Sequence, residues 1–400
     1  MVQFKRNAVD FMRIAFFSPS ADRKNGWGEV TYELCMAYRE RFASEFQVQL
    51  YLPREEQSRP YVAELPFRDS VSFSLPPFAW SFRNPLKLWQ YLEGQIMSPK
   101  PDLVHALDFP YAVAALLCAR YAHCPYLVTL CGTFYKPLHK IPDQFIFQKV
   151  YKAAAHVSAI SAFTLNGPKQ LFGLPDGKTS VIHAGVNYER FAQPADTSFV
   201  RAKYGKDTRI ILGIGALKAR KGFDIVIRAM KQVCIAVPNT VYVIVGQGSD
   251  EASLRSMVQE LGLEKQVFFE TNVTDALLPA YVHAADVYCH TPRMVDGAFE
   301  GFGIVYLQAG SAGKPVVGAR SGGVPDAVVD GETGFLVPEN DVDATAAALI
   351  KILQDSALAK HLGEAGRHYA QKHDWQEIAK QYMGMYESIA SQTSMIARDK

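Results

Sequence analysis

Short apolar segments alternate with helical segments in both halves of this chain, and this alternation constrains the fold more than any other feature. In the first half, strands are expected at residues 13–18, 47–52, 102–106, 126–130, 157–161 and 180–187. In the second half, strands are expected at 209–215, 240–246, 266–270, 286–290, 315–318 and 334–337. Strands separated by helices predict mainly parallel sheets. Because 400 residues exceed what a single core usually organises, two α/β domains are expected.

The composition indicates a globular protein and excludes some classes of function. Hydrophobic residues make up 48% of the chain and charged residues 20%, so sizeable cores can form. There are 42 basic and 40 acidic residues, and this balance argues against a general nucleic-acid binder. The six cysteines lack metal-ligand spacing, which favours reduced thiols in a cytosolic protein and no metal site.

The sequence contains no transmembrane segment or secretory signal that we can identify. Apolar runs stay shorter than the roughly 18 residues of a membrane-spanning helix, and the N-terminus lacks an apolar signal core. A cytoplasmic location is therefore expected. Residues 1–11 form a short leader whose role the sequence does not explain.

Residues 299–310 give the clearest indication of function. An acid, Glu300, precedes a glycine-rich turn, and an uncharged and therefore buried helix is expected from Ile304 to Ala312. Glycines before a helix let a ligand approach the backbone, and the N–H groups of the first turn favour an anion such as phosphate. On a continuous helix, Gln308 would lie about 12 Å along the axis from Glu300 and about 80° around it. The alternative is an ordinary strand-to-helix turn.

This stretch resembles the Glu, seven residues, Glu signature of the retaining glycosyltransferases of family 4, which have the GT-B fold. In that family the first Glu contacts hydroxyl groups of the donor sugar, and the second Glu holds the ribose. The resemblance assigns the sugar to Glu300, and Gln308 would contact the ribose as a neutral amide. It assigns the donor diphosphate to the turn formed by Gly301, Phe302, Gly303 and Ile304.

A second matching segment, residues 215–224, resembles the family's Gly-Arg-Leu…Lys-Gly segment. The family's Lys, which neutralises the donor diphosphate, corresponds to Lys221. The family's Arg corresponds to Ala216, and Arg220 or Lys218 could supply the missing charge. A solvated basic turn is the alternative interpretation.

The resemblance runs from about residue 13 to residue 387 and implies further donor-binding residues. These are Gly26, Gly28, Gly215, Gly246, Val273 and Arg293. The polar loop with Gly26 and Gly28 would face the diphosphate ahead of a helix from about Val30, or would be an ordinary turn. Cys131 stands where many relatives carry a His, and because a thiol cannot replace an imidazole, we interpret it as packing, with a polar role as the alternative.

Residues 72–97 combine aromatic and basic side chains with prolines. One interpretation is a loop and helix buried on the first domain. The other is a surface that faces an acceptor or a membrane, which would allow peripheral contact with the inner face of a membrane.

The implied architecture is α/β and GT-B, with two Rossmann-like domains facing each other across a donor/acceptor cleft. The acceptor-side domain would comprise residues 1–190, joined by a returning C-terminal helix at 375–395. The nucleotide-sugar-binding domain would comprise residues 191–374.

The implied reaction is hexosyl transfer with retention, by front-face displacement, from a nucleotide-diphosphate sugar to a lipid-linked, glycan or small hydroxyl acceptor. Glu300, Lys221 and Arg220 are the expected catalytic residues, and no cofactor or metal is expected.

The motif is closest to mannosyltransferases that use GDP-mannose and lipid-linked acceptors, with UDP-glucose and UDP-N-acetylglucosamine as alternative donors. Because Ala216, Cys131 and Gln308 depart from the pattern, a non-catalytic nucleotide-sugar binder remains an alternative. A GT-B phosphorylase would need a much longer chain.

Overall fold

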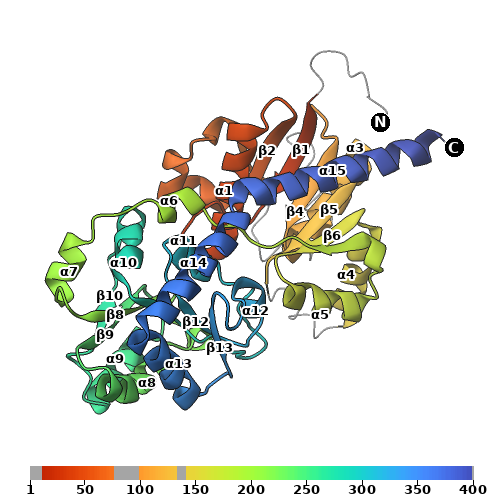
Figure 1. Ribbon diagram of the computed structural model, residues 1–400. Helices are drawn as coiled ribbons and strands as arrows, with labels where there is room; N and C mark the ends of the chain where they lie inside the picture. The colour runs from red at the N-terminus through yellow and green to blue at the C-terminus, as the bar shows by residue number, and fades with distance from the viewer. Residues whose placement is uncertain (1–10, 76–98, 133–140, 399–400) are drawn as a thin grey trace. The chain divides into compact units, whose positions relative to one another are not determined.

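The computed structural model describes residues 11–75, 99–132 and 141–398, which divide into two compact units (Figure 1). Unit 1 contains the chain up to Ile182 and the segment from Trp375 onward, and unit 2 runs from His183 to Asp374. The chain thus enters unit 2 at His183, whereas the motifs predict the domain boundary near residue 190. Most of the 72–97 segment and of the 1–11 leader lies outside the described residues.

In the described part of unit 1, parallel strands form one sheet in the order β3-β2-β1-β4-β5-β6-β7. Every residue of β4 and β5 is buried, as is typical of parallel strands covered on both faces. The strands are β1 (Met12–Phe17), β2 (Phe46–Pro53), β3 (Val71–Leu75), β4 (Leu103–Leu107), β5 (Tyr126–Leu130), β6 (His156–Ala159) and β7 (Thr179–Val181). The α-helices are α1 (Gly26–Arg41), α3 (Phe109–Ala122), α4 (Ile141–Ala153), α5 (Ala162–Phe172) and α15 (Trp375–Arg398).

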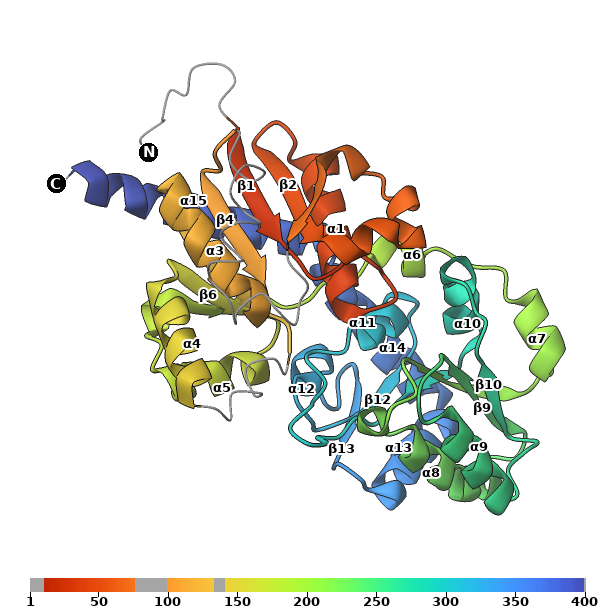
Figure 2. The ribbon, with the colours of Figure 1, turned by 180° about the vertical axis from the view of Figure 1, so that it is seen from behind.

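Helix α15 packs on the sheet of unit 1, although it ends the chain (Figures 1 and 2). The Tyr386 hydroxyl lies 2.8 Å from Nδ1 of His105 in β4 and 3.0 Å from the Tyr38 hydroxyl in α1. All three side chains are buried. Buried polar groups are costly unless they are hydrogen-bonded, so these contacts fix the position of α15 on the sheet.

In unit 2, the described strands form a second parallel sheet in the order β10-β9-β8-β11-β12-β13. Helices lie on both of its faces (Figure 2). The strands are β8 (Arg209–Ile214), β9 (Thr240–Val245), β10 (Val267–Glu270), β11 (Val287–Cys289), β12 (Val316–Ala319) and β13 (Gly334–Val337). The α-helices are α6 (Tyr188–Ala192), α7 (Ser198–Tyr204), α8 (Phe223–Ala236), α9 (Glu251–Glu260), α10 (Leu278–Ala284), α11 (Ile304–Ser311), α12 (Val324–Ala327), α13 (Val342–Gln354) and α14 (Ser356–Lys372).

The prediction of two parallel α/β sheets is confirmed, because apolar runs bounded by turns become buried strands. Strands β5 and β13 have the predicted bounds, whereas β7 is shorter than predicted and β3 was not predicted. The uncharged helix α11 is buried from Tyr306 to Ser311, as expected. Across residues 11–75, 99–132 and 141–398, no helix is long and apolar enough to cross a membrane.

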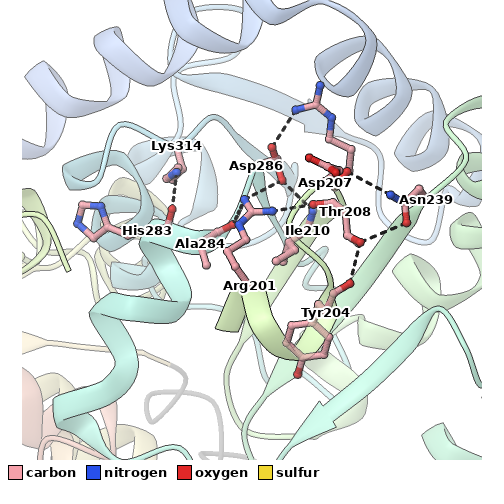
Figure 3. A network of polar contacts seen from close by, with 11 residues as sticks. Arg201, Tyr204, Asp207, Thr208, Ile210, Asn239, His283, Ala284, Asp286 and Lys314 are labelled. Carbon is pink, nitrogen blue, oxygen red and sulfur yellow. Dashed lines mark hydrogen bonds and ion pairs between the residues drawn. The ribbon is translucent and has the colours of Figure 1, made fainter. Parts of the chain in front are cut away.

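Helix α7 is tied to the start of two strands in unit 2 by the side chain of Arg201 (Figure 3). The Arg201 guanidinium donates to the carbonyl oxygens of Thr208, at 2.7 Å, and of Ala284, at 2.5 Å. It also lies 3.5 Å from Oδ2 of Asp286, which accepts a 2.8 Å hydrogen bond from the backbone N–H of Ile210. One cation thus joins α7 to the segments that precede β8 and β11.

We expect Arg201→Met to lower the free energy of urea-induced unfolding by about 1–3 kcal/mol, because two backbone carbonyls lose a charged donor. Lys203→Met on the same helix is the matched control. Lys203 is 52% exposed and pairs with Glu270 at 2.5 Å, and an exposed ion pair is worth at most about 1 kcal/mol. Equal losses in the two variants would show that the Arg201 network adds no more than a surface ion pair.

Candidate functional site

The strand order of unit 2 marks the place where a ligand is expected. From β8 the chain proceeds outward to β9 and β10, and it then returns to β11 on the other side of β8. From β8 and from β11 the chain therefore continues toward opposite sides of the sheet, and open parallel sheets bind ligands at the carboxyl edge beside such a switch point. These two loops contain the residues that the sequence motifs single out.

The loops after β8 and β11 meet in an ion-paired cluster. Nζ of Lys221 lies 2.5 Å from Oε2 of Glu300, and a terminal nitrogen of Arg220 lies 3.1 Å from the same oxygen. Both Lys221 and Glu300 expose 12% of their side chains, and Arg220 exposes 30%. The structure thus brings together the three predicted catalytic residues, and we call them the Glu300 cluster.

The cluster fixes the charge of Glu300. Burial alone raises the pKa of this carboxyl, but the charges of Lys221 and Arg220 outweigh burial and lower it to about 2. The carboxylate therefore contributes stability above the ordinary glutamate range, and that contribution is lost as the pH falls toward 2. At neutral pH Glu300 can accept hydrogen bonds but cannot donate a proton.

The turn after Glu300 is shaped by glycine. Gly303 has φ +101°, and a Cβ there would approach the Tyr306 ring to 2.6 Å. Gly322 has φ +55°, and a Cβ there would lie 2.3 Å from the carbonyl oxygen of Glu300. That carbonyl accepts a 2.8 Å hydrogen bond from the N–H of Gly323, so the turn and the 322–323 loop hold each other in place.

The spacing given for a continuous helix does not apply to this stretch. Helix α11 begins at Ile304 and is preceded by the left-handed Gly303, so Glu300 and Gln308 are not on one continuous helix. The spacing of about 12 Å along a helix axis therefore does not describe this pair. Gln308 lies in α11 and is 4% exposed.

The predicted glycines of the β8 and β9 loops lie beside each other. Gly246 has φ +148°, and a Cβ there would lie 2.0 Å from the carbonyl oxygen of Gly215. Gly215 itself has φ +151° and lies in ordinary contact range of the aliphatic part of Lys221. These glycines keep the carboxyl edge of β8 and β9 free of side chains near Lys221.

Two other predicted residues lie in loops of the same sheet. Arg293 follows β11, and a terminal nitrogen of its guanidinium lies 2.9 Å from Asp224 and 3.1 Å from the side-chain oxygen of Asn340. It is thus engaged with α8 and with the loop after β13. Val273 is half-buried in the loop after β10, at the carboxyl edge.

His290, which follows β11, was missed by the sequence analysis. Its buried ring stacks on Tyr306 with centroids 4.7 Å apart, and its Nδ1 lies 2.9 Å from the Tyr288 hydroxyl. Because that hydroxyl donates to the carbonyl of Ile214 at 3.2 Å, it accepts from Nδ1–H of His290. A polar residue directly after a buried strand is the signal that could have found it.

The protonation state of His290 follows from its surroundings. Burial, together with the charges of Lys221 and Arg220, lowers the pKa of His290 to about 3, while Glu300 opposes this shift. The ring is therefore neutral and does not compete with the two cations for the Glu300 carboxylate.

In unit 1, the predicted loop around Gly26 and Gly28 is instead the first turn of α1. Asn25 caps the helix and accepts a 2.7 Å hydrogen bond from the N–H of Gly28, which is why α1 begins at Gly26 and not near Val30. A Cβ on Gly28 would lie 2.0 Å from the carbonyl oxygen of Asp22. Close packing therefore accounts for Gly28, and its N–H is already bonded.

Asp108, at the carboxyl end of β4, was also missed. Its φ of +58° is strained for a residue other than glycine, and such strain gathers at functional sites. Its Oδ1 accepts a 3.0 Å bond from the N–H of Cys131. Burial raises the pKa of Asp108 to about 7, although hydrogen bonds from Cys131 and Trp27 oppose the rise. Burial also raises the pKa of the Cys131 thiol.

The Glu300 cluster can bind an anion through its cations and a polyhydroxylated group through its carboxylate. In the part of the chain that the structure describes, no group of three or more His, Cys, Asp or Glu side chains could hold a metal ion.

Two protein-family models match the chain. The model described as Glycosyltransferase Family 4 matches residues 24–190, and the model described as Glycosyl transferases group 1 matches residues 196–369. Each unit thus corresponds largely to one family model.

Two curated relatives are mannosyltransferases by name. The GDP-mannose-dependent alpha-(1-6)-phosphatidylinositol monomannoside mannosyltransferase of Mycolicibacterium smegmatis is 38% identical over 219 residues, covering 54% of this chain and 57% of the relative. The GDP-mannose-dependent monoacylated alpha-(1-6)-phosphatidylinositol monomannoside mannosyltransferase of Corynebacterium glutamicum is 33% identical over 236 residues, covering 57% of this chain and 61% of the relative. The matches therefore span little more than half the length of these relatives.

Solved structures of similar fold cover almost the whole chain. HepE of Anabaena in complex with UDP and glucose has a TM-score of 0.77 at 22% identity, covering 94% of this chain and 100% of that chain. Sucrose-phosphate synthase of Thermosynechococcus elongatus has a TM-score of 0.77 at 23% identity, covering 95% of this chain and 100% of that chain. A Family 4 domain followed by a group 1 domain, each built on a parallel Rossmann-like sheet, places this chain in the family 4 glycosyltransferases of GT-B fold.

Proposed function

We propose that this protein is a retaining hexosyltransferase that moves a mannosyl group from GDP-mannose to a hydroxyl group of a lipid-linked acceptor. The observation that carries the proposal is the Glu300 cluster at the carboxyl edge of the unit 2 sheet. Its cations can pair with a diphosphate, and its ionised carboxylate can accept hydrogen bonds from sugar hydroxyls. One cluster can therefore bind the groups on both sides of the sugar–phosphate bond that breaks.

The choice of donor and acceptor rests on the relatives. The two mannosyltransferase relatives are named for GDP-mannose and for phosphatidylinositol monomannoside. HepE was solved with UDP and glucose, but at 22% identity this likeness supports the fold and does not decide the base. A lipid-linked acceptor implies contact with a membrane surface, for which the aromatic and basic 72–97 segment is our candidate.

In the proposed reaction the bond between the sugar C1 and the β-phosphate oxygen breaks, and the acceptor oxygen attacks C1 from the same face. The acceptor's proton passes to the departing phosphate oxygen, so the configuration at C1 is retained. Lys221, Arg220 and the N–H groups of the 301–304 turn stabilise the charge that grows on the diphosphate. Glu300 accepts hydrogen bonds from the sugar and orients the ring.

Donor binding then requires an exchange of partners within the cluster. In the structure, both cations pair with Glu300, and the cluster carries a net charge of +1. An arriving diphosphate shares or takes these cations, and the sugar hydroxyls replace them as donors to the carboxylate. Each charged group keeps a partner throughout, which avoids leaving a buried charge uncompensated.

Purified protein tests the proposal directly when it is mixed with GDP-mannose, UDP-glucose or UDP-N-acetylglucosamine and with vesicles that contain phosphatidylinositol mannosides. Transfer from GDP-mannose, retained anomeric configuration by NMR, and activity in EDTA are expected. Binding of GDP-mannose without transfer or hydrolysis would favour the non-catalytic binder. Loss in EDTA that Mg²⁺ restores would contradict the role of Lys221 and Arg220 as the diphosphate's counter-charges.

Glu300→Gln should lower kcat by a factor of order 10² or more, because a charged acceptor for the sugar hydroxyls is lost. Binding of GDP, measured by calorimetry, should be as tight as in the wild type or tighter, because Lys221 and Arg220 lose their competing carboxylate. Glu332→Gln, at an exposed position of the same unit, is the control. Near-normal turnover of Glu300→Gln would remove Glu300 from the reacting sugar.

Lys221→Met should weaken GDP binding by about 10- to 100-fold, which corresponds to the loss of a hydrogen bond to a charged group. It should also lower kcat, because charge on the leaving phosphate grows during the reaction. Lys218→Met is the matched control, since Lys218 is exposed in the same loop. If Lys218→Met weakens GDP binding as much as Lys221→Met does, the assignment of the diphosphate to Lys221 is wrong.

Gln308→Leu should weaken binding of GDP and UDP alike, by about 1–2 kcal/mol each, if the buried amide holds the ribose that both nucleotides share. Titration of 2′-deoxy-GDP sharpens the test, because the variant should discriminate less between ribose and deoxyribose. Unchanged affinity for both nucleotides would mean that the amide only packs within α11.

A further inference from the structure

Two histidines, His183 and His373, pack against Phe302 of the 301–304 turn. The rings of His183 and His373 stack with centroids 5.3 Å apart, and Nδ1 of His183 lies 3.1 Å from Nε2 of His373. The buried Phe302 ring stacks on His183 at 5.4 Å and contacts His373 at 6.4 Å. The side chain between Gly301 and Gly303 therefore rests on this pair.

The hydrogen-bond partners determine which nitrogens of the pair carry hydrogen. Nδ1 of His373 lies 2.9 Å from the carbonyl oxygen of Tyr369, which can only accept, so Nδ1 carries the hydrogen. In the neutral His373 ring, Nε2 then has only a lone pair, and it accepts from Nδ1–H of His183. The remaining nitrogen of His183, Nε2, lies 3.4 Å from Oδ2 of Asp326.

The two rings respond differently to a further proton. A proton on Nε2 of His183 forms an ion pair with Asp326 and leaves the bond between the rings intact. When His183 already carries that proton, a proton on Nε2 of His373 removes the acceptor and makes two N–H groups face each other, so the bond between the rings is lost. Acid therefore breaks this bond when His373 is protonated opposite a charged His183.

The pair also lies where the chain enters and leaves unit 2, since His183 is its first residue and Asp374 its last. The N–H of Val186 donates to the carbonyl of His373 at 2.9 Å, and the N–H of Tyr188 donates to Asp374 at 3.2 Å. The two connecting segments are thus hydrogen-bonded to each other beside the rings.

The charged groups around the pair come from several elements. Asp326 lies in α12, Tyr369 and Lys372 lie in α14, and Asp374 follows α14. Glu332, in the loop before β13, acts with Asp326 on Tyr369, whose pKa burial raises to about 12. Burial lowers the pKa of His373, the bond to the Tyr369 carbonyl opposes the shift, and the charges of His183 and Lys372 lower it further.

We propose that His183 and His373 are positioning residues of the donor site: their N–H···N bond holds Phe302, and with it the diphosphate-binding turn, and acid loosens the turn by breaking that bond. The proposal rests on the proposed function of the turn. Because the neutral form of His373 is the one the fold favours, the stabilisation is present above the ordinary histidine range and is lost as the pH falls.

Calorimetric titration with GDP at several pH values between about 7.5 and 5.5 tests the proposal. From pH 7.5 to 5.5, the affinity of the wild type should fall about threefold or more further than that of His373→Gln, which keeps an acceptor and a donor but does not titrate. The control His368→Gln removes an exposed histidine from the same helix and should retain the wild-type pH dependence. Protonation of GDP itself changes the measured affinity of every variant in the same way. The comparison between variants therefore removes this contribution.

The outcomes separate this inference from the proposed function. A wild type that binds neither GDP nor UDP at neutral pH would overturn the proposed donor site. A wild type that binds GDP, with the same pH dependence in His373→Gln, would overturn the positioning role.

A second measurement needs neither nucleotide nor variant. Long-range ¹H–¹⁵N spectra of the histidine rings in the wild-type protein should show His373 with its hydrogen on Nδ1 at neutral pH. The Nε2–H form at neutral pH would contradict the proposed bond.

Discussion

The burial of the Glu300 carboxylate is the constraint on which the site depends. A carboxylate taken out of water is costly unless cations and hydrogen bonds compensate it. Here Lys221 and Arg220 compensate it at 2.5 and 3.1 Å. The cations follow β8 and the acid follows β11, so the cluster exists only because β11 pairs with β8 in the sheet.

The surroundings of the cluster follow from the same constraint. Glycines at 215, 246, 303 and 322 adopt positive φ angles and let loops approach one another closely at the carboxyl edge. The neutral His290 packs beside the cluster without adding a charge. Phe302 connects the turn after Glu300 to His183 and His373, where the chain enters and leaves unit 2. A ligand that exchanges partners with the cluster would therefore act on a turn that is packed against the connecting segments.

The sequence predicted the two parallel sheets because buried strands are apolar runs whose period and bounding turns are local properties. It also singled out Glu300, Lys221 and Arg220, which the fold brings into contact. The start of α1 was mispredicted because one side-chain cap, Asn25, decides it. The helix was predicted to begin at Ile304, as it does, but the spacing between Glu300 and Gln308 on a continuous helix does not apply, because the left-handed Gly303 separates Glu300 from the helix.

What the sequence could not predict are contacts made across long separations. The partners of Arg293, the strained backbone of Asp108 and the pairing of His183 with His373 depend on elements that are distant in the chain. Such contacts follow from the packing of whole elements and have no local pattern. Asp108 and His290, which the sequence analysis missed, each follow a buried strand. A polar residue directly after a buried strand can therefore indicate a ligand-binding edge.

The most direct test of the account is a crystal structure of the full chain with bound GDP-mannose. We expect the β-phosphate against Lys221 and the 301–304 turn, the sugar hydroxyls against Glu300, and Lys221 shifted from the carboxylate toward the phosphate. A donor bound elsewhere, or a bound donor that leaves the Lys221–Glu300 pair intact and untouched, would contradict the proposed exchange.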